Sequence, residues 1–512
     1  MAFELTPFND STLTDDVLTY LVDRQAPAMR AKQQKLADYF HNPMTPSTTA
    51  SGANGKSYIQ AQEMGLPPRI TGVGTDASGA TLTDVDRKEV VIENDIAWRL
   101  DTMVDYLFGQ PVTFHSQASD ATTARGIEQI VSSVLDANGG MAFLQELALL
   151  GAVHGFVDVA LRLPAEKPVG WFSRLSHPTG DPVVATSNAA AGRSGLFGAG
   201  IADAGPQLEL IDPARVLTIG AEDDVQQTRY WVQVFDKHRP GVASKRRVPW
   251  GRAGSSESLQ RVEVIEILSA THWQRYEDRT LVAQGANPLG AIPIVHIQNL
   301  PKHGSYSGLS DVESLIPLQD ELNTRLSDRA NRVTYQSFKM YLGKGIDDFL
   351  DRPVGPGQMW TTHNANASIE EFGHDVGSPS EDAHIAQLRQ AMDKTSGVTP
   401  VAAGLVGGQI GQLTSATALR IVLSGLLSKT ARKRLAYGHG LKQLAAMVLT
   451  YLDLAGVFKT DPSDRGIEIA WPSALPGDEG EALRNAQIKS ELGVPADRIL
   501  AELGYELPQT TD

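Results

Sequence analysis

The chain contains no cysteine among its 512 residues. This absence excludes disulfide bonds, thiolate nucleophiles, iron–sulfur clusters and cysteine zinc sites. A secreted disulfide scaffold is therefore excluded, and a reducing compartment is expected. Aromatic residues make up only 6% of the chain, whereas 41% of the residues are hydrophobic. At roughly 150 residues per domain, the length predicts about three domains with more than one core.

Export and membrane segments are also missing from the sequence. The first residues, MAFELTPFND, contain neither a basic stretch nor an apolar run, so no export signal is predicted. No stretch approaches the roughly 18 apolar residues of a spanning helix, and the apolar run AAMVLTYLDLAG contains Asp453. We therefore expect a soluble protein with no membrane partner.

Positive charge is scarce. The chain has 45 Lys and Arg residues against 60 Asp and Glu residues, which gives a formal net charge of −15. Because duplex affinity arises largely from Lys and Arg that displace counterions, this balance argues against a conventional nucleic-acid binder. It does not exclude a protein that DNA only passes, since repulsion keeps a polyanion from adhering.

The sharpest chemical motif is Ala50–Ser57, ASGANGKS, which satisfies a relaxed P-loop pattern. A P-loop needs a buried strand before it and a helix after it, so that backbone N–H groups hold the phosphates. Here the preceding residues HNPMTPSTT do not form a core strand, and Pro67 and Pro68 follow soon afterwards. A loop with a chance match is favoured. A nucleotide-dependent enzyme that uses Lys56 remains the alternative.

Other motifs predict no active site. The twelve histidines show no zinc-protease spacing. The segment GSYSG places Tyr306, not serine, at its centre, so it is not a nucleophile elbow. We expect no enzymatic activity, no metal and no cofactor.

The first 300 residues mix helices and strands without regular alternation, which predicts an α+β fold. Helical spacing covers Asp15–Tyr39, Asp84–Phe108 and Ile127–Gly151, the last interrupted at Asn138–Gly140. Strand-like runs follow at FVDVALRL, QLELI, RYWVQVF, RVEVIEIL, LVAQ and IPIVHIQ. Loops are expected at 41–55, 185–206 and 250–258.

The second half is mainly helical. A capping box at Ser310–Glu313 precedes a helix that runs from Pro317 to Tyr341. Its apolar stripe is narrow, so this helix should pack against neighbours or copies; the stripe comprises Leu315, Leu318, Leu322 and Leu326. The pairs Glu321–Arg325 and Asp328–Arg332 have the spacing of helical ion pairs. Further helices are expected at Glu381–Lys394, Ala416–Leu454, Glu479–Leu492 and Pro495–Leu503.

Four segments together resemble the tailed-bacteriophage portal proteins with an SPP-one-like fold. They are NDIAWRLDTMVDYLFGQPVTF from Asn94, HGFVDVALRL from His154, IPIVHIQNLP from Ile292 with GLSDVESLIPLQDELNTRLSDRANR from Gly308, and SELGVPADRILAELGY from Ser490. The third is the most specific, because it joins an Ile-Pro strand, a Gly-x-Ser-Asp turn and a long helix. The resemblance covers residues 15–510.

The resemblance implies an α+β portal fold with a wing, a helical stem, a small clip and a helical crown. Its expected parts are the wing at 1–305, stem helices at 306–341 and 380–397, the clip at 342–379, the tunnel loop at 398–415, a long wing helix at 416–457 and the crown at 458–512.

The resemblance also implies a function. Portal proteins form a ring, normally of twelve subunits, at one vertex of the capsid. The ring passes double-stranded DNA during packaging and ejection, and docks the large terminase and then head–tail connector or adaptor proteins. Major capsid and scaffolding proteins are further expected partners, with assembly in the host cytoplasm and a final place in the virion. Another phage head structural protein is a second alternative.

Candidate site residues follow from this resemblance. In the tunnel loop, DNA is expected to pass Gly407, Gly408, Gln409 and Gln412. Candidate DNA contacts are Lys429, Arg432, Lys433 and Arg434, although such a run also fits a solvated helix face or pairing with acidic neighbours. Partner docking on the clip is expected at Lys344, Asp347, Asp348, Arg352 and Trp360.

Overall fold

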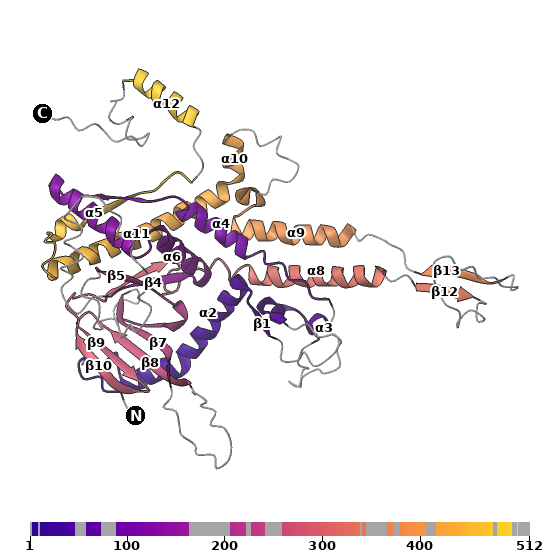
Figure 1. Ribbon diagram of the computed structural model, residues 1–512, viewed down its shortest axis with the longest axis horizontal. Coiled ribbons are helices and arrows are strands. Elements are labelled where there is room, and N and C mark those ends of the chain that lie inside the picture. Colours follow the sequence, from indigo (N-terminus) through magenta and orange to yellow (C-terminus); the bar gives the residue numbers. More distant parts are fainter. Residues whose placement is uncertain are drawn as a thin grey trace, which may run out of the picture.

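The chain forms a body of helices and antiparallel sheets, from which two helices project side by side (Figure 1). The computed structural model describes residues 3–8, 11–46, 58–72, 89–162, 205–221, 227–240, 259–337, 340–344, 366–372, 379–404, 416–474, 479–493 and 499. A two-stranded hairpin stands beyond the far end of the projecting pair (Figure 1). No helix within these ranges is both long and apolar enough to cross a membrane.

The N-terminal helix is confirmed as three continuous segments. They are α1 (Asp15–Tyr20), a π-helical turn (Leu21–Gln25) and α2 (Ala26–His41). Asn42, whose φ is 43°, ends α2 in the left-handed conformation. Two short strands then pair, β1 (Met44–Pro46) and β2 (Tyr58–Gln60), so part of the loop expected at 41–55 is a strand. A 3₁₀ turn (Ala61–Gly65) and α3 (Pro68–Thr71) follow.

Residues 84–88 of the helix predicted for Asp84–Phe108 lie outside the described residues, and the described part is helical only from Ala97, as α4 (Ala97–Phe108). The prediction was wrong for Glu89–Asp95, which is extended because a helix distant in sequence bonds its backbone, as described below. Next come α5 (Ala121–Ala137) and α6 (Met141–His154). They are separated at the predicted Asn138–Gly140, where both glycines have positive φ, a region that Gly adopts without steric strain.

The described elements include both helices and sheets, which confirms a mixed helix-and-sheet fold. All described strand pairs are antiparallel. One sheet has the order β11–β4–β5, and a second has the order β10–β9–β8–β7–β6. Their bounds are β4 (Phe156–Arg162), β5 (Gln207–Ile211), β6 (Val216–Gly220), β7 (Thr228–Pro240), β8 (Leu259–Leu268), β9 (His272–Glu277), β10 (Thr280–Ala286) and β11 (Ile294–Gln298). The sequence did not predict β6 or β9, which are short and follow turns.

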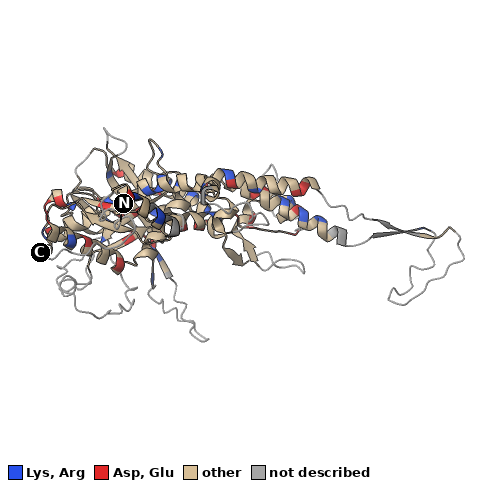
Figure 2. Ribbon diagram, turned by 90° about the horizontal axis from the view of Figure 1, so that it is seen from above, with Lys and Arg blue, Asp and Glu red and all other residues tan. Residues whose placement is uncertain are grey.

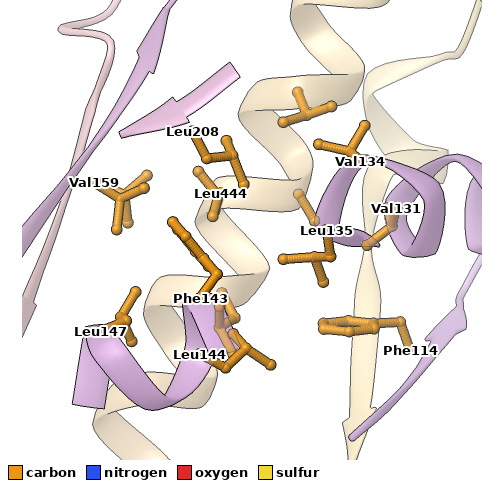
Figure 3. Packing of buried hydrophobic residues seen from close by; sticks show 14 of the residues in the cluster. Phe114, Val131, Val134, Leu135, Phe143, Leu144, Leu147, Val159, Leu208 and Leu444 are labelled. Carbon is orange, nitrogen blue, oxygen red and sulfur yellow. The ribbon is translucent and has the colours of Figure 1, made fainter. Parts of the chain in front are cut away.

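The largest apolar cluster joins α5, α6, the smaller sheet and α11 (Ser424–Leu454). In Figure 3, Phe143, Leu147 and Val159 lie on one side of Leu444, with Val134 and Leu135 on the other. The helix predicted for Ala416–Leu454 is divided at Leu423, so a separate helix α10 (Ala416–Val422) precedes α11.

Two short strands also connect the body to later parts of the chain. Strand β14 (Ile467–Ala470) pairs with β3 (Thr113–Ser116). Residues at the start of the expected crown therefore belong structurally to the body. Beyond them, α12 (Glu479–Glu491) confirms the helix expected from Glu479, whereas most of Pro495–Leu503 lies outside the described residues.

The projecting pair consists of α8 (Ile316–Ser337) and α9 (Pro379–Ser396). The Ser310 Oγ atom accepts a hydrogen bond from the Glu313 N–H (3.3 Å), but a turn precedes α8, which begins at Ile316. Helix α8 ends at Ser337 rather than at the predicted Tyr341. The reason is that β12 (Met340–Lys344) pairs there with β13 (Ser368–Phe372).

Candidate functional site at the base of the paired helices

Helices α8 and α9 pack through an apolar seam and through charged residues along their lengths (Figure 2). The seam includes Leu322, Leu388 and Met392, which are buried. The predicted pair Glu321–Arg325 is confirmed at 2.7 Å. Two further arginines of α8 reach α9: Arg329 pairs with Asp382 (3.0 Å), and Arg332 pairs with Glu381.

A second face of α8 carries a row of polar residues that bonds an extended segment, Glu89–Asp95, here called the strap. The residues of the row are spaced four apart along α8. Each of them accepts one hydrogen bond from a backbone N–H of the strap, and the donors are alternate strap residues. The N–H to O distances lie between 2.9 and 3.1 Å, in the pairs Asn331–Glu89, Ser327–Val91, Asn323–Glu93 and Gln319–Asp95. The strap backbone is therefore satisfied by side chains rather than by a sheet.

The two repeats stay aligned because their lengths nearly match. Four residues of an α-helix advance about 6.0 Å, and two residues of extended chain advance about 6.6 Å. The amides at the two ends of the row also donate to strap carbonyls, Asn331 to Glu89 (3.0 Å) and Gln319 to Glu93. The strap therefore fixes α8 over most of its length.

The strap also binds α9, through charges. Glu93 accepts a hydrogen bond from Arg389 (2.7 Å). Arg99 on α4, only 1% exposed, links Asp95 (3.3 Å) to Asp393 of α9 (2.6 Å). The strap thus holds both projecting helices against the body, and so sets the direction in which they project.

A buried charge cluster lies where the projecting pair meets the body. Asp311, just before α8, is within 2.7 Å of the Lys429 ammonium and 2.6 Å of the Lys433 ammonium, both from α11. The Asn299 amide also donates to this carboxylate (2.8 Å). Lys429 donates to the Ser396 carbonyl at the end of α9 (2.8 Å). One carboxylate therefore links α8, α9 and α11.

Burial and charge act in opposite directions on Asp311. Burial alone would raise its pKa, but the ammonium groups of Lys433 and Lys429 lower the pKa to about 2. Burial lowers the pKa of Lys433, while Asp311 opposes that shift. The phenol of Tyr437 beside the cluster has its pKa raised well above the usual value by burial and by Asp311. The carboxylate is thus held ionised in the interior.

This cluster changes how the expected DNA contacts are interpreted. Lys433 is 2% exposed, and Lys429 is mostly covered, so the pairing with an acidic neighbour is the arrangement observed. Arg434 is half-buried, lies over the Trp471 ring (5.2 Å) and donates to the Tyr106 carbonyl (3.4 Å). Arg432 is the exposed member of the four. A DNA contact by Lys433 would require its ion pair to break.

The remaining predicted residues are mostly not described. Lys344 is exposed at the end of β12. Outside the described residues lie the tunnel-loop residues Gly407, Gly408, Gln409 and Gln412 and the clip residues Asp347, Asp348, Arg352 and Trp360. Residues 185–204 of the loop expected at 185–206 also fall there, as does the loop expected at 250–258.

The surroundings of the other motifs do not resemble catalytic sites. The segment Ala50–Ser57 lies outside the described residues, but strand β2 follows it where a P-loop has a helix. Tyr306 donates a hydrogen bond to the fully buried Asp158 (2.7 Å) and stacks on His296. Across the described ranges, no three His, Asp or Glu residues are grouped so as to hold a metal.

A comparison with models of known protein families finds a match in the second half of the chain. Residues 256–504 match the family model described as "Phage portal protein, SPP1 Gp6-like". The matched region contains β8–β11, the projecting pair with its hairpin, α11 and α12. The predicted resemblance to phage portal proteins is therefore confirmed over these residues.

Solved structures give a distant likeness. One chain, from "Virion of native gene transfer agent (GTA) particle", is 12% identical with a TM-score of 0.42, over 81% of this chain and 90% of that chain. Another, from "Neck of empty GTA particle computed with C6 symmetry", is 13% identical with a TM-score of 0.44, over 81% and 91%. No curated protein matches the sequence.

Proposed function

We propose that this chain is a portal protein: copies assemble as a closed ring, normally of twelve, at one capsid vertex, and double-stranded DNA passes through it during packaging and ejection. The single observation that carries the proposal is the family match over residues 256–504. That match spans the projecting helices and the buried charge cluster, whereas the strap lies before it in the chain.

The projecting pair supports assembly into a ring. A helix pair that extends from the body, with charged residues along its outer faces and Val333 of α8 53% exposed, offers surfaces for neighbouring copies. Closed rings are built from heterologous interfaces, in which two different surfaces of the chain meet. The strap and the buried charge cluster would keep every copy of the pair at the same angle.

In this proposal the parts take the roles that the resemblance implies. Residues 1–305 form the wing, 306–341 and 380–397 the stem, 342–379 the clip, 398–415 the tunnel loop, 416–457 the long wing helix and 458–512 the crown. The large terminase and then the head–tail connector dock on the clip, around Lys344. Capsid and scaffolding proteins surround the ring in the virion. The net charge of −15 suits a conduit that guides DNA without retaining it.

Mass measurement of the purified protein in solution, at several salt concentrations, tests the proposal. We expect a single closed oligomer in at least one condition, with a mass that is an integral multiple of the chain mass. A protein that stays monomeric in all conditions would contradict it.

Two further measurements address the alternatives. A nucleotide-dependent enzyme would hydrolyse ATP and lose that activity in Lys56→Ala; we expect no hydrolysis by either protein. Another phage head structural protein could also form a ring, but it would lack an open axis lined by the projecting pair. The position of α8 and α9 in a particle image distinguishes a portal ring from a ring of another phage head structural protein.

A further inference from the structure

A pocket of about 570 Å³ lies where the end of α9, the turn before α8 and the first part of α11 meet. In Figure 1 these elements converge where the projecting pair joins the body. The buried charge cluster forms one side of the pocket, through Asp311 and Lys429. Hydroxyl groups of Ser314 and Ser428 also line it.

The pocket carries more positive than negative charge. Its wall contains the cations Lys394, Lys429 and Arg432, and the acids Asp311 and Glu313. Each of these acids already has a cation that is not part of the wall. Buried Lys433 binds Asp311 (2.6 Å), and Lys32 of α2 binds Glu313 (3.2 Å). The positive surplus is unusual in a chain whose formal charge is −15.

The surplus has no partner within the described part of the chain. Lys394 and Arg432 are exposed, and neither has an ion pair or a hydrogen bond to another described residue. Lys429, only 12% exposed, shares its one carboxylate with Lys433. The burial penalty applies to Lys429, because a mostly buried positive charge is unfavourable unless anions neutralise it, whereas Lys394 and Arg432 add exposed positive charge beside it. The wall is therefore suited to receive a negatively charged group.

We propose that this pocket, between Lys394 and Arg432, binds an acidic side chain of a second copy of the chain. The inference rests on the proposed ring, in which each copy places a different surface against its neighbour. A chain with 60 Asp and Glu residues provides such carboxylates. Asp311 and Glu313 in the wall repel a polyanionic duplex, whereas a single carboxylate carries only one negative charge and is attracted to Lys394 and Arg432.

Carbodiimide cross-linking of the assembled ring tests the contact directly, because it joins an amine to a carboxylate only where the two touch. Rings are formed from a mixture of ¹⁵N-labelled and unlabelled chains, so that links between copies are recognised by mass spectrometry. We expect Lys394 to be joined to an Asp or Glu of another copy. Lys442, exposed on α11 but outside the pocket wall, is the matched control and should give at least tenfold less cross-linked product.

A charge-reversal variant gives the second readout. Lys394→Glu with Arg432→Glu should raise the protein concentration needed for half-assembly at least tenfold, whereas Lys442→Glu should leave it unchanged. Both reversed side chains are exposed, so an unchanged thermal unfolding midpoint of the unassembled chain verifies folding.

Three outcomes would overturn the inference. Rings with no link from Lys394 to another copy would refute the contact. An unchanged assembly midpoint in the double variant would do the same. Normal assembly together with weakened binding of a short DNA duplex would show that the pocket binds phosphate instead. Wild-type protein that forms no ring would overturn the proposed function itself, which is a separate result.

Discussion

Asp311 shows how one residue joins three helices. Its carboxylate is buried between the ammonium groups of Lys429 and Lys433. It also accepts a hydrogen bond from the side-chain amide of Asn299, directly after β11. Breaking a buried ion pair by removing one partner typically costs about 3–5 kcal/mol, because the other charge is left in the interior. The position of α8 relative to α11 thus depends on a charge that must stay ionised.

Asp311→Asn should lower the free energy of unfolding by about 3–5 kcal/mol, because Lys429 and Lys433 lose their shared carboxylate. Chemical denaturation of the unassembled chain measures the change. Glu313→Gln is the matched control, since its ion pair with Lys32 is exposed and contributes about 0–1 kcal/mol. Equal losses in the two variants would refute the central role of Asp311.

His154, at the end of α6, predicts a pH dependence. Burial lowers its pKa from 6.5 to about 4, although Asp212 opposes this shift. The unfolded chain therefore binds more protons between pH 6.5 and about 4, so stability is full above this window and falls as the pH decreases through it. The loss should approach about 3 kcal/mol.

Denaturation midpoints at pH 7 and pH 4.5 measure this dependence. In His154→Asn, whose amide can still bond Gln33, the difference between the two midpoints should shrink. A difference as large in the variant as in the wild-type chain would assign the pH dependence to other groups.

At the scale of elements, the strap is the feature that sequence reasoning missed. Helical spacing over Asp84–Phe108 predicted a helix that would have included the strap. The extended conformation is instead decided by α8, whose Ser327 lies 236 residues from Val91 along the chain. The polar row was visible in the sequence at Gln319, Asn323, Ser327 and Asn331, but such a row also fits a solvated helix face.

Native-state hydrogen exchange tests the row. The N–H groups of Val91 and Glu93 should exchange slowly, and Asn323→Ala should expose that of Glu93, with a loss of about 1–3 kcal/mol for a buried donor left unpaired. Thr324→Ala is the control, because that hydroxyl bonds the Asp320 carbonyl of its own helix. Equal exchange rates of the Glu93 N–H in both variants would contradict its hydrogen bond to Asn323.

Two glycines of α11 allow a matched comparison of packing. A Cβ atom at Gly440 would lie 2.3 Å from Cγ1 of Ile297 on β11, whereas one at Gly438 would meet no atom closer than 3.6 Å. Gly440→Ala should therefore destabilise the chain by about 1–3 kcal/mol. Gly438→Ala should stabilise it by up to about 1 kcal/mol through helix propensity. Thermal unfolding measures both, and the same sign for both would refute this view of the α11–β11 contact.

Local chemistry explains which parts the sequence could predict. The break between α5 and α6 was predictable because Gly139 and Gly140 adopt positive φ, and strands such as β4 and β8 were predictable from their β-branched runs. The charge cluster was not, since Asp311 and Lys433 are 122 residues apart and only the folded chain shows that they meet. The basic run on α11 was visible, but its burial was not.

For the whole molecule, the body, the strap and the charge cluster together hold one helix pair in a fixed direction. Copies arranged around an axis would use it, because identical angles are what a closed ring requires. The family match over residues 256–504 covers the helix pair and the charge cluster but not the strap.

Electron cryomicroscopy of the purified, assembled particle, viewed along its axis, tests this claim most directly. We predict a closed ring with an open axis and with density for α8 and α9 around the opening. A particle without an axial opening, or with the helix pair on its periphery, would contradict the account.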